Sequence, residues 1–162
     1  MTGKKSVLEL KINGDTYEIA CTPNMTLLEA LRDKAFLTGT KRGCDAGGCG
    51  ACTIIRDGEA VLACLTLAVE AEGCDIRTIE GLAQDGKLSP VQEAFVEHGA
   101  IQCGFCSPGF IMSAAALLAE VPSPSREEIR RNLAGNLCRC TGYVKIIGAV
   151  EAAAAKNRGG EK

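Results

Sequence analysis

Apolar and polar residues alternate along the first part of the chain, which is the pattern of half-buried β-strands. Residues 7–12 alternate in this way, an Asn-Gly pair at 13–14 supplies a tight turn, and residues 17–20 continue the alternation after the turn. A second hairpin is expected over residues 52–64, around an Asp-Gly turn. The beginning of the chain is therefore predicted to form two hairpins.

Between the two hairpins the pattern changes to that of a short helix. The hydroxyl of Thr26 can cap the helix while Glu29 reaches back to the backbone of Thr26, which is a capping box. Three leucines within residues 27–31 give this helix an apolar face. Strands, one helix and a long loop predict a mixed α/β domain over residues 1–80.

The second half of the chain carries helix signals instead of strand signals. Ser-Pro pairs at 89–90 and 107–108 each place a capping serine before a proline at the first helical position. A capping box over residues 125–128 predicts a third helix, and a fourth is expected from about Tyr143. Four short helices predict a small four-helix bundle over residues 81–162.

Two small domains are therefore expected, with residues 73–88 as the linker between them. A chain of 162 residues can form two modest hydrophobic cores. Aromatic residues make up only 4% of the chain and Trp is absent, so neither core has large anchors, and bound metal would help to stabilise both. The formal net charge is −2 and there is no basic run, so nucleic acid is not expected as a partner.

Eight of the ten cysteines fall into two sets of four. The first cysteine set consists of Cys44, Cys49, Cys52 and Cys64. Its first three members have the C-x4-C-x2-C spacing of plant-type [2Fe–2S] ligation, and four thiolates supply two ligands for each iron. Four glycines surround these three cysteines, and glycine lets the backbone wrap closely around a cluster at positive φ. An ordinary flexible surface loop would not need this combination.

The second cysteine set consists of Cys103, Cys106, Cys138 and Cys140. The first two members precede the helix predicted at Pro108, and the last two precede the helix predicted at Tyr143. Helix N-termini offer free N–H groups and a positive dipole end, which suit an anionic cluster. On spacing alone, a tetrahedral zinc site made of the same four thiolates is an alternative to a second [2Fe–2S] cluster.

Many cysteines in a secreted protein would suggest disulfides. The N-terminus is charged throughout and has no apolar signal core, and the longest mostly apolar stretch, residues 110–119, is too short to span a bilayer. We therefore expect a reduced, cytoplasmic protein that does not bind membranes and whose clustered cysteines bind metal. The two remaining cysteines, Cys21 and Cys74, are expected to act as small hydrophobes.

The sequence contains no nucleophile–base arrangement, no P-loop and no dinucleotide-binding fingerprint. Catalytic residues are therefore not expected on this chain. A protein that holds two clusters without catalytic groups is most simply an electron conduit.

Three blocks of the chain are informative together: TKRGCDAGGCGACT, IQCGFCSPGFIMSA and GNLCRCTGYVKI. They resemble the small iron–sulfur subunit, or iron–sulfur domain, of the xanthine dehydrogenase and aldehyde oxidoreductase family of molybdenum hydroxylases, over about residues 5–155. The resemblance implies an α+β fold, with an N-terminal β-grasp plant-type ferredoxin domain followed by a C-terminal four-helix bundle. It also implies that both cysteine sets bind [2Fe–2S] clusters.

The same resemblance implies a non-catalytic electron-transfer subunit of a molybdopterin-dependent oxidoreductase. Electrons would pass between molybdopterin, in a dinucleotide form, on a large subunit and FAD on a medium subunit, through the two [2Fe–2S] clusters. The three subunits would form a dimer of heterotrimers. Gln102 matches a glutamine that hydrogen-bonds the pterin, and Cys140 matches the cluster ligand beside the pterin amino group.

Two other classes of protein stay open. A free-standing ferredoxin-like electron carrier would have no enzyme attached, and the second cluster domain together with Gln102 argues against it. A zinc-stabilised interaction module would have no redox role, and its colourless solution would distinguish it from a red-brown cluster protein.

Overall fold

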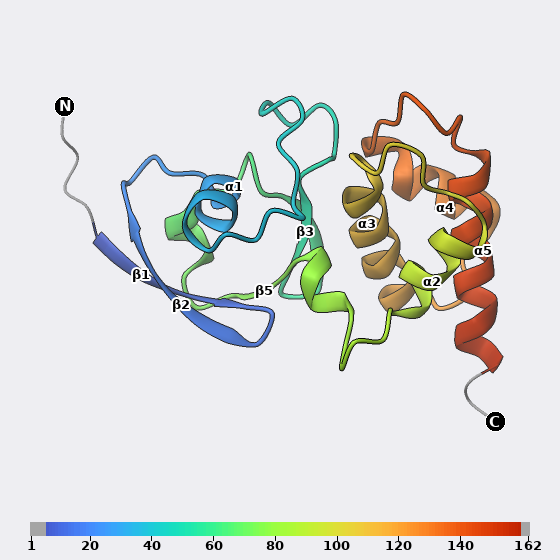
Figure 1. Ribbon diagram of the computed structural model, residues 1–162, viewed down its shortest axis with the longest axis horizontal. Helices are drawn as coiled ribbons and strands as arrows, with labels where there is room; N and C mark the ends of the chain where they lie inside the picture. The colour runs from blue at the N-terminus through green and yellow to red at the C-terminus, as the bar shows by residue number, and fades with distance from the viewer. Residues whose placement is uncertain (1–5, 160–162) are drawn as a thin grey trace.

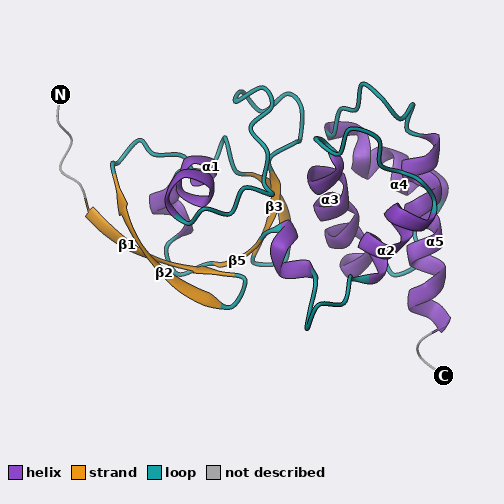
Figure 2. Cartoon of the chain, in the orientation of Figure 1, coloured by secondary structure: helices purple, strands orange, loops and turns teal. Residues whose placement is uncertain are grey.

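The computed structural model describes residues 6–159, which form a sheet half and a helical half lying side by side (Figures 1 and 2). The strands are β1 (Ser6–Ile12), β2 (Asp15–Cys21), β3 (Thr53–Arg56), β4 (Glu59–Leu62) and β5 (Asp75–Arg77). The α-helices are α1 (Leu27–Glu29), α2 (Pro90–Glu97), α3 (Ser107–Glu120), α4 (Arg126–Asn132) and α5 (Val144–Gly159). Strands and long helices occupy different parts of the chain, so the fold is α+β.

The five strands form one mixed sheet in the order β2-β1-β5-β3-β4. Both predicted hairpins are confirmed, because β1 pairs antiparallel with β2 and β3 pairs antiparallel with β4. Asn13 and Gly14 both have positive φ, at 55° and 91°, as a tight two-residue turn requires. The turn at Asp57 and Gly58 has the same character, with φ of 51° and 90°.

The central strand of the sheet lies inside the stretch expected to be a linker. Residues 75–77 form β5, which pairs parallel with β1 and antiparallel with β3. The linker prediction over residues 73–88 is therefore wrong at these positions. A strand of three residues with only Ile76 as an apolar member has no readable alternation, and Ile76 is 1% exposed because its side chain packs into the hydrophobic core beneath the sheet.

The predicted start of α1 is confirmed. Thr26 accepts the N–H of Glu29, and the carboxylate of Glu29 accepts the N–H of Thr26, which completes the capping box. The helix continues into a π-helical turn, Ala30–Lys34. Leu27, Leu28 and Leu31 are fully buried, so α1 and this turn seal the hydrophobic core of the sheet half.

Residues 90–159 contain four α-helices around a second hydrophobic core. Ser89 and Ser125 cap α2 and α4 as predicted, each in a capping box. The predicted cap at Ser107 is wrong, because Ser107 is already inside α3 and buried, and Cys106 occupies the N-cap position without a side-chain bond. Within residues 6–159, no helix has the length and apolar character to cross a membrane.

The two halves meet where α3 packs along β3 (Figure 1). This contact sets the loop before β3 beside the segments that precede α3 and α5, and all three lie along the same edge of the molecule in Figure 1. These are the segments that carry most of the cysteines.

Candidate cluster-binding sites

The first cysteine set extends from the hydrophobic core to the surface. Cys52 and Cys64 are 3% and 6% exposed, Cys49 is half-buried and Cys44 is exposed. Pairing of β3 with β4 brings Cys64 close to Cys52, since the N–H of Ala63, the residue before Cys64, donates to the carbonyl of Cys52 at 3.2 Å. One side of this site is thus closed by the sheet half and the other faces outward.

Backbone N–H groups point at the exposed thiol of this set. The sulfur of Cys44 accepts from Ala46 at 3.4 Å and from Gly48 at 3.2 Å. The Ala46 N–H, followed by the Cys49 side chain, lowers the pKa of Cys44 to about 7. Burial raises the pKa of Cys52 to about 12, so at neutral pH this thiol requires a bound cation to ionise.

Glycines shape this loop in two ways. Gly47 and Gly50 have positive φ, at 78° and 70°, as expected for a backbone that wraps around a cluster. Gly43 is needed for a different reason, because a Cβ there would lie 2.7 Å from the sulfur of Cys49. Gly48 shows neither constraint, since an added Cβ would meet open space.

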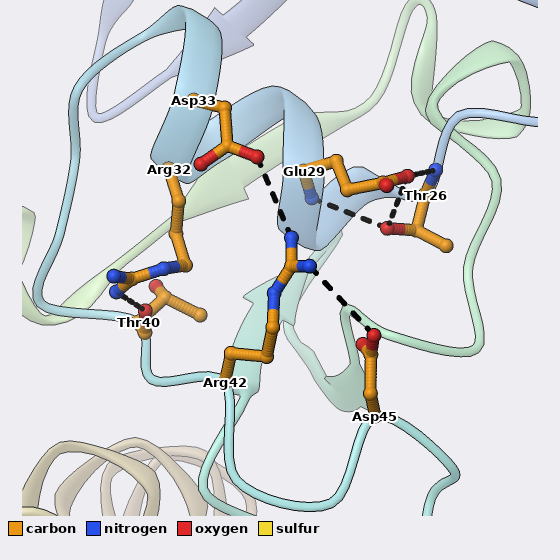
Figure 3. Close-up of polar contacts among 7 residues, drawn as sticks. All are labelled: Thr26, Glu29, Arg32, Asp33, Thr40, Arg42 and Asp45. Carbon is orange, nitrogen blue, oxygen red and sulfur yellow. Dashed lines mark hydrogen bonds and ion pairs between the residues drawn. The ribbon is translucent and has the colours of Figure 1, made fainter.

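Arg42 secures the outer end of the loop. Figure 3 shows its guanidinium between Asp33 and Asp45, at 3.4 Å and 3.8 Å. Asp45 directly follows Cys44 and has a φ of 56°, so the ion pair supports a backbone conformation that is uncommon for a residue with a side chain. In the same view Arg32 donates to the carbonyl of Thr40 at 2.7 Å, which ties the preceding segment to the helical turn.

The second cysteine set is assembled from two segments that are distant in the sequence. Cys103 and Cys106 precede α3, whereas Cys138 and Cys140 lie in the loop before α5. Cys103 and Cys140 are exposed, and the other two are half-buried. Burial raises the pKa of Cys106 to about 12.

Cys138 is the most firmly held member of this set. Its sulfur accepts from the hydroxyl of Thr141 at 3.0 Å, from the N–H of Thr141 at 3.3 Å and from the N–H of Cys140 at 3.4 Å. Burial acts to raise the pKa of Cys138, but these donors, led by the Thr141 hydroxyl, outweigh it and lower the pKa to about 7. The N–H of Cys138 donates to the hydroxyl of Tyr143 at 2.9 Å, and the Tyr143 ring packs edge-on against Phe110.

The eight thiols form four neighbouring pairs. The pairs are Cys44 with Cys49, Cys52 with Cys64, Cys103 with Cys140, and Cys106 with Cys138. The two sulfur atoms of the Cys103–Cys140 pair are 3.7 Å apart. Among the described residues, no three Cys, His, Asp or Glu side chains converge on the position of a single ion. Two thiol pairs per site are the donor set of a two-iron core, which takes two thiolates on each iron.

Residues 136–137 join the two sites, although the sequence pattern does not single them out. The N–H of Leu137 donates to the carbonyl of Cys49 at 2.9 Å. The side-chain amide of Asn136, which is 4% exposed, donates to the carbonyl of Gly50 at 2.9 Å. Proximity to Cys138 in the block GNLCRC is the one signal that could have drawn attention to them.

The remaining candidate residues lie apart from these contacts. Gln102 is exposed next to Cys103. Cys21 is fully buried, as expected of a small hydrophobe, and Cys74 is half-buried with its thiol 3.7 Å from the carbonyl oxygen of Glu70.

Two family models match the chain and together cover most of it. A 2Fe-2S iron-sulfur cluster binding domain matches residues 10–75, and a [2Fe-2S] binding domain matches residues 78–151. Each range contains one complete cysteine set. Because the model that covers the second set also describes a [2Fe-2S] domain, the match favours iron–sulfur over zinc at the second site.

Relatives of the chain are subunits of oxidoreductases. It is 53% identical over 143 residues to the nicotine 6-hydroxylase small subunit of Paenarthrobacter nicotinovorans, covering 88% of this chain and 86% of the relative. It is 50% identical over 145 residues to the xanthine dehydrogenase iron-sulfur-binding subunit of Escherichia coli, covering 88% of this chain and 91% of the relative.

Solved structures repeat the whole fold. A chain of quinoline 2-oxidoreductase from Pseudomonas putida 86 matches with a TM-score of 0.92 and 49% identity, over 98% of this chain and 99% of that one. The aldehyde oxidoreductase from Desulfovibrio gigas matches with a TM-score of 0.91 and 44% identity, over 96% of this chain but 18% of that one. The same two-part unit thus occurs both as a separate chain and within a much longer one.

Proposed function

This chain belongs to the iron–sulfur subunits of the xanthine dehydrogenase and aldehyde oxidoreductase family, and we propose that it conducts electrons between redox sites on partner subunits. The observation that carries the proposal is the junction of the two cysteine sites. Leu137, the neighbour of Cys138, donates its N–H to the carbonyl of Cys49 at 2.9 Å, so a single hydrogen bond links the backbones at the two sites. Bound [2Fe–2S] clusters would supply the chemistry, since each takes up and releases one electron.

The eight paired cysteines are the proposed cluster ligands. Cys44, Cys49, Cys52 and Cys64 would hold one cluster, and Cys103, Cys106, Cys138 and Cys140 the other. The pairing of the thiols supports this assignment, with each pair on one iron. The chain would also donate N–H groups to the ligand sulfurs, as it does at Cys44 and Cys138, and such bonds tune cluster potentials.

The proposed partners are a large subunit with molybdopterin, in a dinucleotide form, and a medium subunit with FAD. Gln102 and Cys140 are both exposed, so both are available to a pterin, and the amide of Gln102 can donate and accept hydrogen bonds. The helical half would then contact the large subunit, and the sheet half would lie nearer the flavin. A dimer of heterotrimers in the cytoplasm is the assembly that we propose.

The two halves correspond to the two proposed domains. Residues 1–80 would form a β-grasp ferredoxin domain, and residues 81–162 a four-helix-bundle domain. Two separate hydrophobic cores support this division. Ile79 and Leu82 pack against the helical core, which supports a boundary close to residue 80.

Metal analysis and purification test the proposal. Anaerobically handled protein should be red-brown and contain about four iron and four acid-labile sulfide per chain. It should co-purify with a molybdenum-containing subunit and a flavin-containing subunit. About two irons and one zinc per chain would contradict the second cluster. A stable free monomer with both clusters, purified from the native source, would favour the free-standing carrier.

Gln102→Ala tests the contact with the pterin. This variant should keep both clusters but slow their reduction by substrate in the assembled enzyme, since the proposed hydrogen bond to the pterin is lost. Rapid mixing followed at the cluster absorbance measures the rate. An unchanged rate with a fully loaded molybdenum site would remove Gln102 from the electron path.

A further inference from the structure

A buried asparagine lies between the two cysteine-bearing loops and makes hydrogen bonds to both halves of the molecule. The Oδ1 atom of Asn136 accepts the hydroxyl of Ser113, on α3, at 2.8 Å. Its Nδ2 atom donates to the carbonyl of Gly50 at 2.9 Å and to Oγ1 of Thr53, the first residue of β3, at 3.3 Å. The side chain thus connects the helical half to the loop of the first cysteine set.

The backbones at this junction are packed so closely that little displacement is possible. A Cβ on Gly50 would lie 2.5 Å from the carbonyl oxygen of Gly135, and a Cβ on Gly109 would collide with the carbonyl of Gly50. Beside these contacts lies the hydrogen bond from Leu137 to the carbonyl of Cys49. Two consecutive carbonyls of the first loop, at residues 49 and 50, are therefore held by two consecutive residues of the second.

We propose that Asn136 is a positioning residue for electron transfer between the two clusters. Its amide fixes the spacing and orientation of the loop that carries Cys49 relative to the loop that carries Cys138, through hydrogen bonds to Ser113, Gly50 and Thr53 and not as a cluster ligand. The inference rests on the proposed function, since it requires a redox cluster at each site. Electron exchange weakens steeply with separation, so a side chain that sets the spacing also sets the rate.

The chemistry of the contact favours positioning over simple stabilisation. An apolar side chain would fill the same space without restricting the direction of approach, whereas the amide needs an acceptor on one side and a donor on the other. A satisfied buried amide specifies one arrangement, because any shift leaves a polar group unpaired. Both of its partners in the first loop region, Gly50 and Thr53, lie next to a proposed cluster ligand.

Two variants of Asn136 test this inference in the chain carrying both clusters. Asn136→Asp keeps the size and the acceptor for Ser113 but places an oxygen against the carbonyl of Gly50, and Asn136→Ala removes the amide. The matched control is Asn132→Ala, which alters an exposed asparagine at the end of α4. Low-temperature EPR of the fully reduced chain measures the magnetic splitting between the clusters. Flash photoreduction with a deazaflavin measures how fast an electron equilibrates between them.

In both Asn136 variants, the individual cluster signals and the iron content should persist, while the splitting changes and the equilibration rate falls several-fold. Asn132→Ala should match the wild type. A lower thermal midpoint with unchanged splitting and rate would overturn the inference, because Asn136 would then be only structural. If either Asn136 variant loses a cluster, Ser113→Ala decides: it removes only the hydroxyl that orients Oδ1, and unchanged splitting in this variant would overturn the inference.

The EPR spectrum of the wild-type chain distinguishes a failure of this inference from a failure of the proposed function. Absence of two cluster signals in the wild type would contradict the proposed function itself. Two wild-type signals whose splitting is insensitive to both Asn136 substitutions and to Ser113→Ala would contradict only the role of Asn136.

Discussion

The two cysteine sites use the same number of thiols but are built in different ways. The first is closed within residues 44–64, where a glycine-containing loop returns to a hairpin of the sheet. The second joins residues 103–106 to residues 138–140, and these segments meet only because the helices of the second half pack together. The first site thus depends mainly on local backbone conformation, and the second on tertiary packing.

The sites also differ in their exposure. Two thiols of the first set are buried in the core of the sheet half, whereas every thiol of the second set is exposed or half-buried. Solvent exposure and hydrogen bonds to sulfur tune the reduction potential of a cluster. Two clusters held in these sites should therefore be electronically distinct, although their ligands are chemically identical.

The largest expected effect is the loss of one whole cluster when a single cysteine ligand is replaced at either site. Reduced wild-type protein should show two separate EPR signals. Cys49→Ala should abolish one signal and Cys106→Ala the other, each with the loss of about two irons, because each cluster needs four thiolates. If either substitution abolished both signals while the chain stayed folded, the division into two sets would be wrong.

Disruption of the helical core should affect the second site selectively. Phe110 is fully buried, and its ring packs against Tyr143, whose hydroxyl accepts the N–H of Cys138. Phe110→Ala should lower the free energy of unfolding by about 3–5 kcal/mol and release the second cluster first. The measurement is the EPR intensity of each cluster in samples heated to increasing temperatures, which shows which cluster is lost first.

The matching core change in the sheet half is Leu10→Ala, at a position that is also fully buried. It should cost about 2–5 kcal/mol and weaken the first cluster more than the second. Equal loss of both signals in both variants would show that the two sites do not depend on separate cores.

A smaller effect on stability is expected from replacing glycines in the loop of the first cysteine set. Gly50→Ala should cost about 1–3 kcal/mol, because a side chain at φ 70° is strained and its Cβ would meet the carbonyl of Gly135. Gly48→Ala is the control and should stay within about 0.5 kcal/mol of the wild type, since an added Cβ there meets open space. The thermal midpoints of both variants measure the difference, and equal midpoints would contradict the close approach of the two loops.

The smallest expected effect is the pH-dependent stabilisation by the capping-box glutamates, which should be similar in the two halves. The backbone N–H of Thr26 lowers the pKa of Glu29 in the sheet half, and the hydroxyl of Ser125 lowers the pKa of Glu128 in the helical half. Because both pKa values are lowered on folding, the ionised carboxylates stabilise the protein above the ordinary Glu range, and this stabilisation is lost as pH falls through the lowered values.

The substitutions Glu29→Gln and Glu128→Gln should therefore lower the thermal midpoint slightly at neutral pH. The difference from the wild type should vanish in acid, below the lowered pKa values. A difference that grew as the pH fell would contradict the sign of both shifts.

Local rules account for what the sequence alone determined. Alternation and tight-turn residues predicted both hairpins, capping boxes predicted the starts of α1 and α4, and the Ser-Pro pair at 89–90 predicted the start of α2. The spacing of the cysteines divided them into two sets, and the matching family models each cover one set. The hairpins and the helix starts depend on conformational preferences of residues close together in the chain, so they can be read without knowing what packs against them. The division of the cysteines rests instead on matching their spacing to known ligand patterns.

Only the tertiary structure decided the features that join distant residues. β5 is a strand because β1 and β3 pair with its three residues, and Ser107 lies inside α3 instead of capping it. The contacts of Asn136 with Ser113 and Gly50 have the same origin. Each depends on burial and hydrogen bonding between segments far apart in the sequence. Such contacts produce no repeating pattern of apolar and polar residues in either segment, so the sequence alone does not predict them.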